Sequence, residues 1–281
     1  ADIDAFPICL ATQDSDEIVQ TVRYLAPSVG GINLEDIAAP RCFDIEDALQ
    51  DLGIPVFHDD QHGTAIAVLA GVINALLVTG RKIEETKFVF AGAGAGGIAS
   101  TKLLLDHGAT HVTLVDSVGI ISRDRTDLTP VKSSMLDISN PENLKGGLAE
   151  AMKGSDVFIG LAAAGAVTPE MVSSMAKDPV VFAMANPIPE IWPDDARAAG
   201  AAVVGTGRSD FPNQVNNSLV FPGVFRGALD SHATRVTTSM KLAAGQALAD
   251  LVAEPTPENV LPWSLDRQVA QTVAKAVSGA A

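Results

Sequence analysis

Two pairs of adjacent carboxylates are the residues in this sequence whose type and spacing could do chemistry. Glu35-Asp36 and Asp59-Asp60 each follow a short apolar run that is typical of a β-strand. Acidic side chains this close together repel one another unless a cation neutralises them, and oxygen ligands favour Mg²⁺ or Mn²⁺ over softer metals. Each pair could instead occupy the first turn of a helix, where the helix dipole favours acidic residues. The two pairs together favour a divalent-metal site.

Two histidines flank the second acidic pair. His58 and His62 have the H-x-x-x-H spacing of zinc hydrolases, a motif that needs both rings on one face of a helix. The apolar run Ile54–Phe57 indicates a strand before His58, and the next helix is expected to begin only near Gly63. We therefore interpret the histidines as packing residues or neighbours of the metal ligands, and not as zinc ligands.

A glycine-rich loop forms a second candidate site. Gly92, Gly94 and Gly97 spell G-x-G-x-x-G directly after the apolar run Phe88–Phe90. The first glycine allows a tight turn, the second lets the backbone approach a pyrophosphate, and the third lets strand and helix pack closely. Free N–H groups at the start of the next helix, around Ala95, favour a phosphate. A tight turn without a ligand is the alternative, but the strand–loop–helix context favours a nicotinamide dinucleotide.

The residues after this loop leave the choice between NAD and NADP open. Asp116 ends the next expected strand, where a carboxylate would accept hydrogen bonds from the ribose hydroxyls of NAD. Arg123, Arg125 and Lys132 follow soon after. They could meet the 2′-phosphate of NADP, or they could be ordinary solvated charges.

The elements that must position these groups alternate along the chain. Strands are expected at Phe6–Leu10, Val29–Leu34, Ile54–Phe57, Phe88–Phe90, Val112–Val115, Val157–Ile159, Val180–Phe182 and Ala202–Val204. Helices are expected at Asp16–Val22, Ile45–Leu52, Ala65–Val78, Ile98–Leu105, Pro169–Met175, Asp194–Ala199, Thr237–Val252 and Leu265–Val277. Strands that alternate with helices predict parallel βαβ units. The expected class is α/β, with a doubly wound Rossmann-type dinucleotide domain beside a second α/β domain.

Composition limits the possible partners. The chain has 281 residues, of which 47% are hydrophobic, and a formal net charge of -15. These values are typical of a compact globular protein and argue against a nucleic acid or an anionic membrane surface as partner. Cys9 and Cys42 are the two cysteines, so no disulfide framework is expected, and a reducing cytoplasm is the expected compartment. Because the first residues are acidic, we expect them not to form a signal peptide.

Taken in order, these motifs resemble the malic enzymes, in particular their short bacterial form. The matching stretches are Gly31–Phe43, Phe57–Ala65, the glycine-rich loop, Phe182–Pro187 and Gly207–Asn217. The similarity covers nearly the whole chain, and several motifs in the right order make it specific. The resemblance implies oxidative decarboxylation of L-malate to pyruvate and CO₂, with reduction of NAD or NADP and a requirement for Mg²⁺ or Mn²⁺. It also implies a homodimer.

The resemblance implies a role for each matching residue. The implied metal ligands are Glu35, Asp36 and Asp60. Asp59 would support a catalytic lysine. Asn186 and Asn217 would contact malate, and Asn216 would lie near the nicotinamide, with Asn186 also expected beside the cofactor.

The match departs from the family in its acid–base pair. The family's general-acid tyrosine and general-base lysine lie upstream of the Asp4–Pro7 stretch, so we expect an N-terminal segment to be missing and the chain alone to lack both groups. Tyr24, the only tyrosine, does not match the tyrosine motif and is interpreted as a packing residue.

We expect a metal and substrate domain at 1–58 and a dinucleotide-binding domain at 59–216. A helical segment at 217–281 is expected to return to the first domain. Two other functions stay open: a metal-free dehydrogenase of the amino-acid or shikimate type, and a non-catalytic NAD(P)-binding module. The former would give no reason for two acidic pairs, and the latter would bind the cofactor without turnover.

Overall fold

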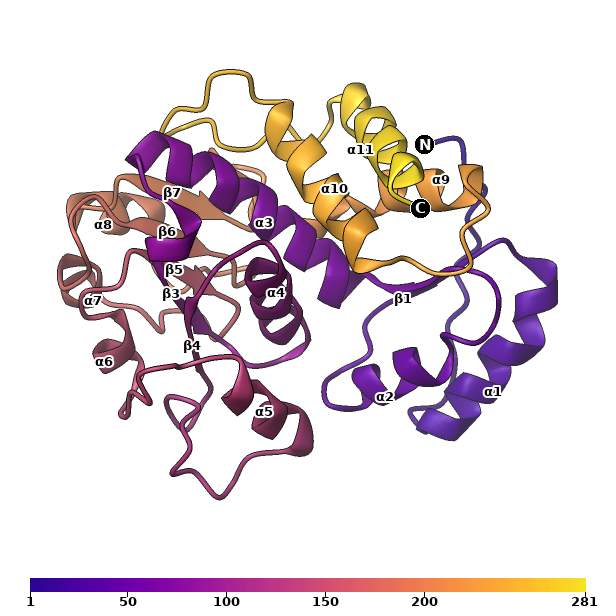
Figure 1. Cartoon of the computed structure of the whole chain (residues 1–281), viewed down its shortest axis with the longest axis horizontal. Helices are drawn as coiled ribbons and strands as arrows, with labels where there is room; N and C mark the ends of the chain where they lie inside the picture. Colours follow the sequence, from indigo (N-terminus) through magenta and orange to yellow (C-terminus); the bar gives the residue numbers. More distant parts are fainter.

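The computed structural model describes residues 1–281, which form two parallel β-sheets connected by one long helix (Figure 1). The smaller sheet pairs β1 (Ile32–Leu34) with β2 (Val56–His58). The larger sheet has the strand order β4-β3-β5-β6-β7, with all pairs parallel. Its strands are β3 (Lys87–Ala91), β4 (His111–Val115), β5 (Val157–Gly160), β6 (Val180–Ala183) and β7 (Val203–Thr206). The predicted α/β class is confirmed.

The larger sheet is buried on both faces because its strands are apolar at almost every position. Phe90 and Phe182 point to the face covered by α3 (Asp59–Thr79) and α4 (Ala95–Asp106). Val89 and Phe158 point to the opposite face. That face is covered by α6 (Leu148–Met152), α7 (Pro169–Ser173) and α8 (Pro193–Ala198). Strand order reverses between β3 and β5, and in such sheets ligands bind at the carboxyl ends of the strands beside that point.

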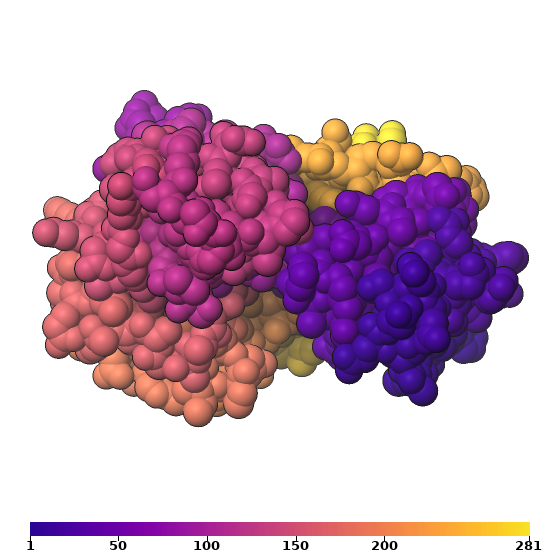
Figure 2. Space-filling model, turned by 90° about the horizontal axis from the view of Figure 1, so that it is seen from below, coloured from indigo at the N-terminus to yellow at the C-terminus, as the bar shows by residue number.

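The smaller sheet has its own small core. The helices α1 (Ser15–Leu25) and α2 (Arg41–Ala48) pack on it. Apolar residues at helical spacing, such as Ile18 and Val22 in α1 and Ile45 in α2, face the two strands. Figure 2 shows this N-terminal part as an indigo lobe beside the larger lobe built on the five-stranded sheet.

Helix α3 joins the two lobes and is apolar nearly all round. By length and composition it could cross a membrane, but most of it is buried inside the molecule, as in a core helix. The buried amide of Asn74 donates to the carbonyl oxygens of Ala249 and Val260, at 2.9 and 3.0 Å. This pairing satisfies a polar group that would otherwise be costly to bury.

Three C-terminal helices complete the chain: α9 (Phe221–Asp230), α10 (Thr238–Asp250) and α11 (Arg267–Gly279). Helix α9 lies against the smaller sheet, where the ring of Phe225 meets that of Phe57 edge-on at 5.8 Å. Helix α10 packs against α3. A short helix, α5 (Pro130–Ser134), and 3₁₀ turns at 26–28, 83–85, 135–137 and 217–219 fill the connections. The domain boundaries at 58 and 216 stay predictions.

Three expectations for the N-terminal part were wrong. Phe6–Leu10 forms no strand, and Phe6 and Ile8 are 79% and 56% exposed, because no neighbouring strand pairs with this segment. Tyr24 is 76% exposed and does not pack. Helix α2 begins at Arg41 and ends at Ala48, earlier than the predicted Ile45–Leu52, because the chain turns at Leu49 to enter β2.

Candidate active site

The parallel register of β1 and β2 brings the predicted metal ligands together. Leu34 pairs with His58, so the residues that follow each strand leave the same edge of the sheet side by side. Carboxylate oxygens of Glu35, Asp36 and Asp60 lie within 4.8 Å of one another. A set of oxygen ligands alone, at these distances, fits Mg²⁺ or Mn²⁺.

The backbone at this cluster is held in an uncommon conformation. Asp36 has φ 56°, in the left-handed region, which costs about 1 kcal/mol for a residue other than glycine. Its N–H donates to Oδ2 of Asp60 at 3.0 Å, and Asn33 donates its amide N–H to Oε2 of Glu35 at 2.7 Å. The strand ends therefore fix the orientation of the carboxylates before any ligand arrives.

Asp59 is a buried carboxylate that is only half satisfied. Its Oδ2 accepts a hydrogen bond from the amide of Asn217 at 2.8 Å, whereas its buried Oδ1 has no partner. Gly63 makes room for it, because a Cβ there would lie 1.8 Å from that Oδ1. Burial first, and then the charges of Glu35 and Asp60, raise the pKa of the Asp59 carboxyl to about 8. Such an oxygen suits a cationic neighbour.

We expect Mn²⁺ binding to release protons and to tighten as the pH rises. Burial and the charge of Asp60 also raise the pKa of Glu35. Because a cation favours the ionised carboxylates, binding must displace the protons that Asp59 and Glu35 keep, so Mn²⁺ affinity falls as the pH drops below about 8. Calorimetric titrations at pH 7, in two buffers of different ionisation enthalpy, measure the number of protons released. Asp59→Asn should remove most of that release, and equal binding heats in the two buffers would contradict the expectation.

The expected start of α3 was wrong, so the reason first given against a zinc site fails. The helix begins at Asp59 and not near Gly63, so His58 precedes it and His62 lies in its first turn. Nε2 of His62 lies 2.8 Å from Oε1 of Glu46, and Nδ1 lies 3.0 Å from Nζ of Lys241. Both ring nitrogens of His62 are engaged, so it cannot converge with His58 on a metal without breaking this network.

The glycine-rich loop has the steric constraints that its spacing predicts. Gly92 has φ 111°, and a Cβ there would lie 2.3 Å from the carbonyl oxygen of Leu161. A Cβ at Gly97 would lie 1.8 Å from the carbonyl oxygen of Gly92, whereas a Cβ at Gly94 would meet nothing within 4 Å. No side chain caps the start of α4, so its first N–H groups are free to bind a phosphate.

A cavity of about 680 Å³ opens beside this loop, near the point where the strand order reverses. Gly94, Asp116 and Ala162 line it from the larger lobe, and Pro40 and Phe43 line it from the smaller lobe. Its size and position suit a dinucleotide held between the two lobes.

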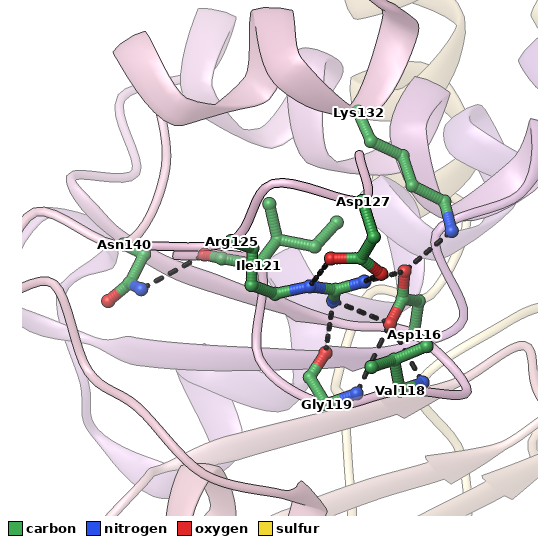
Figure 3. A network of polar contacts seen from close by, with 8 residues as sticks. All are labelled: Asp116, Val118, Gly119, Ile121, Arg125, Asp127, Lys132 and Asn140. Carbon is green, nitrogen blue, oxygen red and sulfur yellow. Dashed lines mark hydrogen bonds and ion pairs between the residues drawn. The ribbon is translucent and has the colours of Figure 1, made fainter. Parts of the chain in front are cut away.

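Asp116 is the centre of a charged network at the rim of this cavity (Figure 3). The guanidinium of Arg125 binds both of its oxygens, at 2.7 and 3.1 Å, and Lys132 binds Oδ2 at 2.6 Å. The N–H groups of Val118 and Gly119 also donate to Oδ1. Burial alone would raise the pKa of Asp116, but the hydrogen bonds from Arg125 and Lys132 hold it well below its usual range. With five donors already bound, Asp116 can accept from a ribose only if a donor moves.

Of the three basic residues that follow Asp116 in the sequence, Arg123 stands apart. Its guanidinium donates to the carbonyl oxygen of Leu136 and makes no bond to Asp116. Two cations rather than three therefore lie where a 2′-phosphate would be expected.

The three asparagines lie on two loops of the larger lobe. Asn217 reaches the carboxylate cluster through Asp59. The side chain of Asn216 caps a 3₁₀ turn by accepting from Ser218, and its amide lies 3.5 Å from the carbonyl oxygen of Gly207. Asn186 is exposed on the loop that follows β6. The structure places Asn217 at the acidic site, whereas no contact places Asn186 or Asn216 against it.

Sequence reasoning missed two groups near the site. Glu46 is buried and, besides its contact with His62, accepts a hydrogen bond from the amide of Gln61 at 2.8 Å. The sequence pattern that could have identified it is an acidic residue on the apolar side of a helix. Glu190 is completely buried on the loop after β6, within the otherwise uncharged run Pro187–Pro193. A lone charge in such a run is the signal that could have identified it.

Comparison with known proteins gives one consistent result. The family model described as "Malic enzyme, NAD binding domain" matches residues 61–281, and "Malic enzyme, N-terminal domain" matches residues 10–50. A bifunctional malic/malolactic enzyme of Bacillus subtilis (strain 168) is 54% identical over 285 residues, covering 100% of this chain and 70% of that protein. An NAD-dependent malic enzyme of Geobacillus stearothermophilus is 51% identical over 284 residues, covering 100% of this chain and 59% of that protein.

The fold gives the same result. The crystal structure of an NAD-dependent malic enzyme from Thermotoga maritima superposes with a TM-score of 0.97 at 48% sequence identity, covering 100% of this chain and 75% of that one. A malic enzyme from Pyrococcus horikoshii gives a TM-score of 0.95 at 45% identity, covering 99% and 66%. The chain spans 59% to 70% of the length of the two curated relatives. With the NAD-binding family model matching residues 61–281 and a relative 54% identical over the whole chain, the chain belongs to the malic enzyme family.

Proposed function

We propose that this protein catalyses the oxidative decarboxylation of L-malate to pyruvate and CO₂, with reduction of NAD or NADP and dependence on a divalent cation. One observation carries the proposal: the backbone of the glycine-rich loop packs closely against the backbone of Asp60, a member of the acidic cluster. A Cβ on Gly96, in the first turn of α4, would lie only 3.1 Å from the carbonyl oxygen of Asp60. A hydride acceptor beside that loop and a substrate at the carboxylates would therefore be neighbours.

The residues of the cluster suit a hydroxy acid held through a cation. Glu35, Asp36 and Asp60 would hold Mg²⁺ or Mn²⁺, because they offer only carboxylate oxygens to it. When bound, the cation supplies Lewis-acid polarisation of the oxygen on C2 of malate. It also offsets the repulsion between the dianionic substrate and this acidic edge. We propose that the amide of Asn217, which donates to Asp59, orients the substrate, and that Asn186 has the same role.

Asp59 would organise the proton transfers at C2. Its unpartnered Oδ1 is buried and therefore favours a protonated neighbour, such as the lysine that the family resemblance implies. We propose that Asp59 orients that cationic group and holds it close to the substrate hydroxyl. The nicotinamide, when bound in the cavity, would supply the hydride acceptor, and we propose that Asn216 lies near it.

The Asp116 network leads to a prediction on cofactor choice. Asp116→Asn should lower the KM for NADP by about tenfold relative to that for NAD, because loss of one carboxylate charge frees Arg125 and Lys132 to meet a 2′-phosphate. Initial rates with each cofactor give the ratio. Arg123→Ala is the matched control, because Arg123 does not contact Asp116, and it should leave the ratio unchanged. An unchanged NADP to NAD ratio in Asp116→Asn would show that these cations do not face the ribose.

The proposal is tested by following reduced nicotinamide formed from L-malate, with NAD and NADP in turn, in the presence of Mn²⁺ or of a chelator. Turnover that the chelator abolishes supports it. Oxidation that persists in chelator would indicate a metal-free dehydrogenase. Cofactor binding without any turnover would indicate a non-catalytic dinucleotide-binding module.

A further inference from the structure

Glu190 is a buried carboxylate with no cation beside it. It is 0% exposed, and its two oxygens accept hydrogen bonds from backbone N–H groups: Oε1 from Ala162 at 2.9 Å and Oε2 from Ala185 at 3.0 Å. Burying a charge without a cation costs free energy of folding. If the side chain only filled this space, an apolar residue would make the fold more stable. The reason for a carboxylate at this position must therefore lie in the two groups that it binds.

The two N–H groups belong to different loops of the site. Ala162 lies on the loop after β5 and lines the dinucleotide cavity, whereas Ala185 directly precedes Asn186 on the loop after β6. The main chain adds to the connection, because Gly165 donates to the carbonyl oxygen of Pro189 at 3.1 Å. One side chain thus holds the cofactor side and the proposed substrate side of the cleft together.

The sheet is shaped to admit this carboxylate. Gly160 is the last residue of β5, and a Cβ there would lie 2.4 Å from the carboxyl carbon of Glu190. Any other residue at this strand end would displace the carboxylate. The space is therefore specific to Glu190 and lies at the carboxyl edge of the sheet, where ligands bind.

We propose that Glu190 is a positioning residue, which fixes the loop that lines the dinucleotide cavity relative to the loop that carries Asn186. The part that concerns malate rests on the proposed function, whereas the part that concerns the dinucleotide does not. Each bond is charge-assisted and therefore stronger than a bond between neutral groups. A displacement of about 1 Å between the two loops would misalign hydride donor and acceptor, which can reduce the rate on the order of 100-fold.

Two substitutions in the complete protein test the proposal. Glu190→Asp keeps the charge but withdraws both oxygens by one methylene. The dissociation constant for reduced dinucleotide, followed by its fluorescence without malate, and the KM for malate should both rise about tenfold. Glu190→Gln keeps the shape but replaces one acceptor by an NH₂ group. It should release one loop, so that one of the two constants rises about tenfold.

The matched control lies at the other end of β5. Asp156 also accepts a backbone N–H, from Lys87 at 2.9 Å, but at the edge of the sheet away from the cavity. Asp156→Asn should lower the melting temperature without changing either constant. Because the dinucleotide titration needs no malate, its result for Glu190→Asp decides the inference even if the protein does not turn malate over.

A purely structural role predicts a different pattern. If both Glu190 variants lose thermal stability as Asp156→Asn does, with the dinucleotide dissociation constant and the malate KM within twofold of the unmodified protein, Glu190 does not position the loops. If Glu190→Gln does not fold, the dinucleotide dissociation constant of Glu190→Asp decides: a rise supports the inference, and an unchanged value overturns it. If Glu190→Asp does not fold, a rise in either constant of Glu190→Gln supports the inference, and no change in both overturns it.

Discussion

Replacing Asp60 by Ala is expected to abolish metal-dependent turnover while leaving dinucleotide binding nearly intact. Asp60 supplies one of three carboxylates whose oxygens lie within 4.8 Å, and its Oδ2 also fixes the backbone of Asp36. Loss of this group removes both a ligand and the orientation of a second one. Because Lewis-acid polarisation contributes several kcal/mol to such reactions, kcat/KM for malate should fall on the order of 10³-fold or more.

The control for this substitution is an acidic residue outside the cluster. Asp47 is exposed on α2 and contributes no ligand, so Asp47→Ala should retain full activity. The assay is kcat/KM at saturating Mn²⁺, with a fluorescence titration of reduced dinucleotide in parallel. Asp60→Ala with unchanged activity would disprove the metal assignment, and loss of dinucleotide binding would show that the substitution damaged the fold.

Gly97→Ala is the second change with a large expected effect, because the new Cβ would lie 1.8 Å from the carbonyl oxygen of Gly92. The loop must open to accommodate it, which should weaken dinucleotide binding on the order of 100-fold and lower the melting temperature. Gly94→Ala provides the contrast, since its Cβ would meet no protein atom within 4 Å. It should weaken binding, because the ligand approaches there, but leave the melting temperature unchanged.

Gly279→Ala is the matched control for the glycine series. Gly279 lies in the last turn of α11, and a Cβ there would also meet nothing within 4 Å. Neither binding nor stability should change. If Gly94→Ala binds the dinucleotide as well as Gly279→Ala does, the cofactor does not approach the backbone at this loop.

The sequence predicted those features of the site that depend on local patterns. The spacing of Gly92, Gly94 and Gly97 predicted the loop, because a strand–loop–helix turn that binds a dinucleotide requires a glycine at each of these positions. The acidic cluster could be expected because residues at the ends of parallel strands share an edge, and Leu34 does pair with His58.

The features that sequence missed depend on contacts between distant segments. An apolar run such as Phe6–Leu10 becomes a strand only beside a partner, and the pattern does not reveal whether one is present. The partners of Glu190 could not be predicted from the sequence, because they are the backbone N–H groups of Ala162 and Ala185, and almost every residue has such a donor. Asp116 was expected to bind a ribose, but its saturation by five donors emerges only when the loop after β4 folds back over it.

The most direct test of the proposed reaction is the stoichiometry of one reaction mixture containing L-malate, cofactor and Mn²⁺. Reduced nicotinamide, pyruvate and CO₂ are measured together, with and without chelator. Metal-dependent oxidative decarboxylation should give equimolar amounts of all three products, and none when the cation is removed. Reduced nicotinamide without CO₂, products other than pyruvate, or a reaction indifferent to the chelator would contradict metal-dependent oxidative decarboxylation at the cluster of Glu35, Asp36 and Asp60.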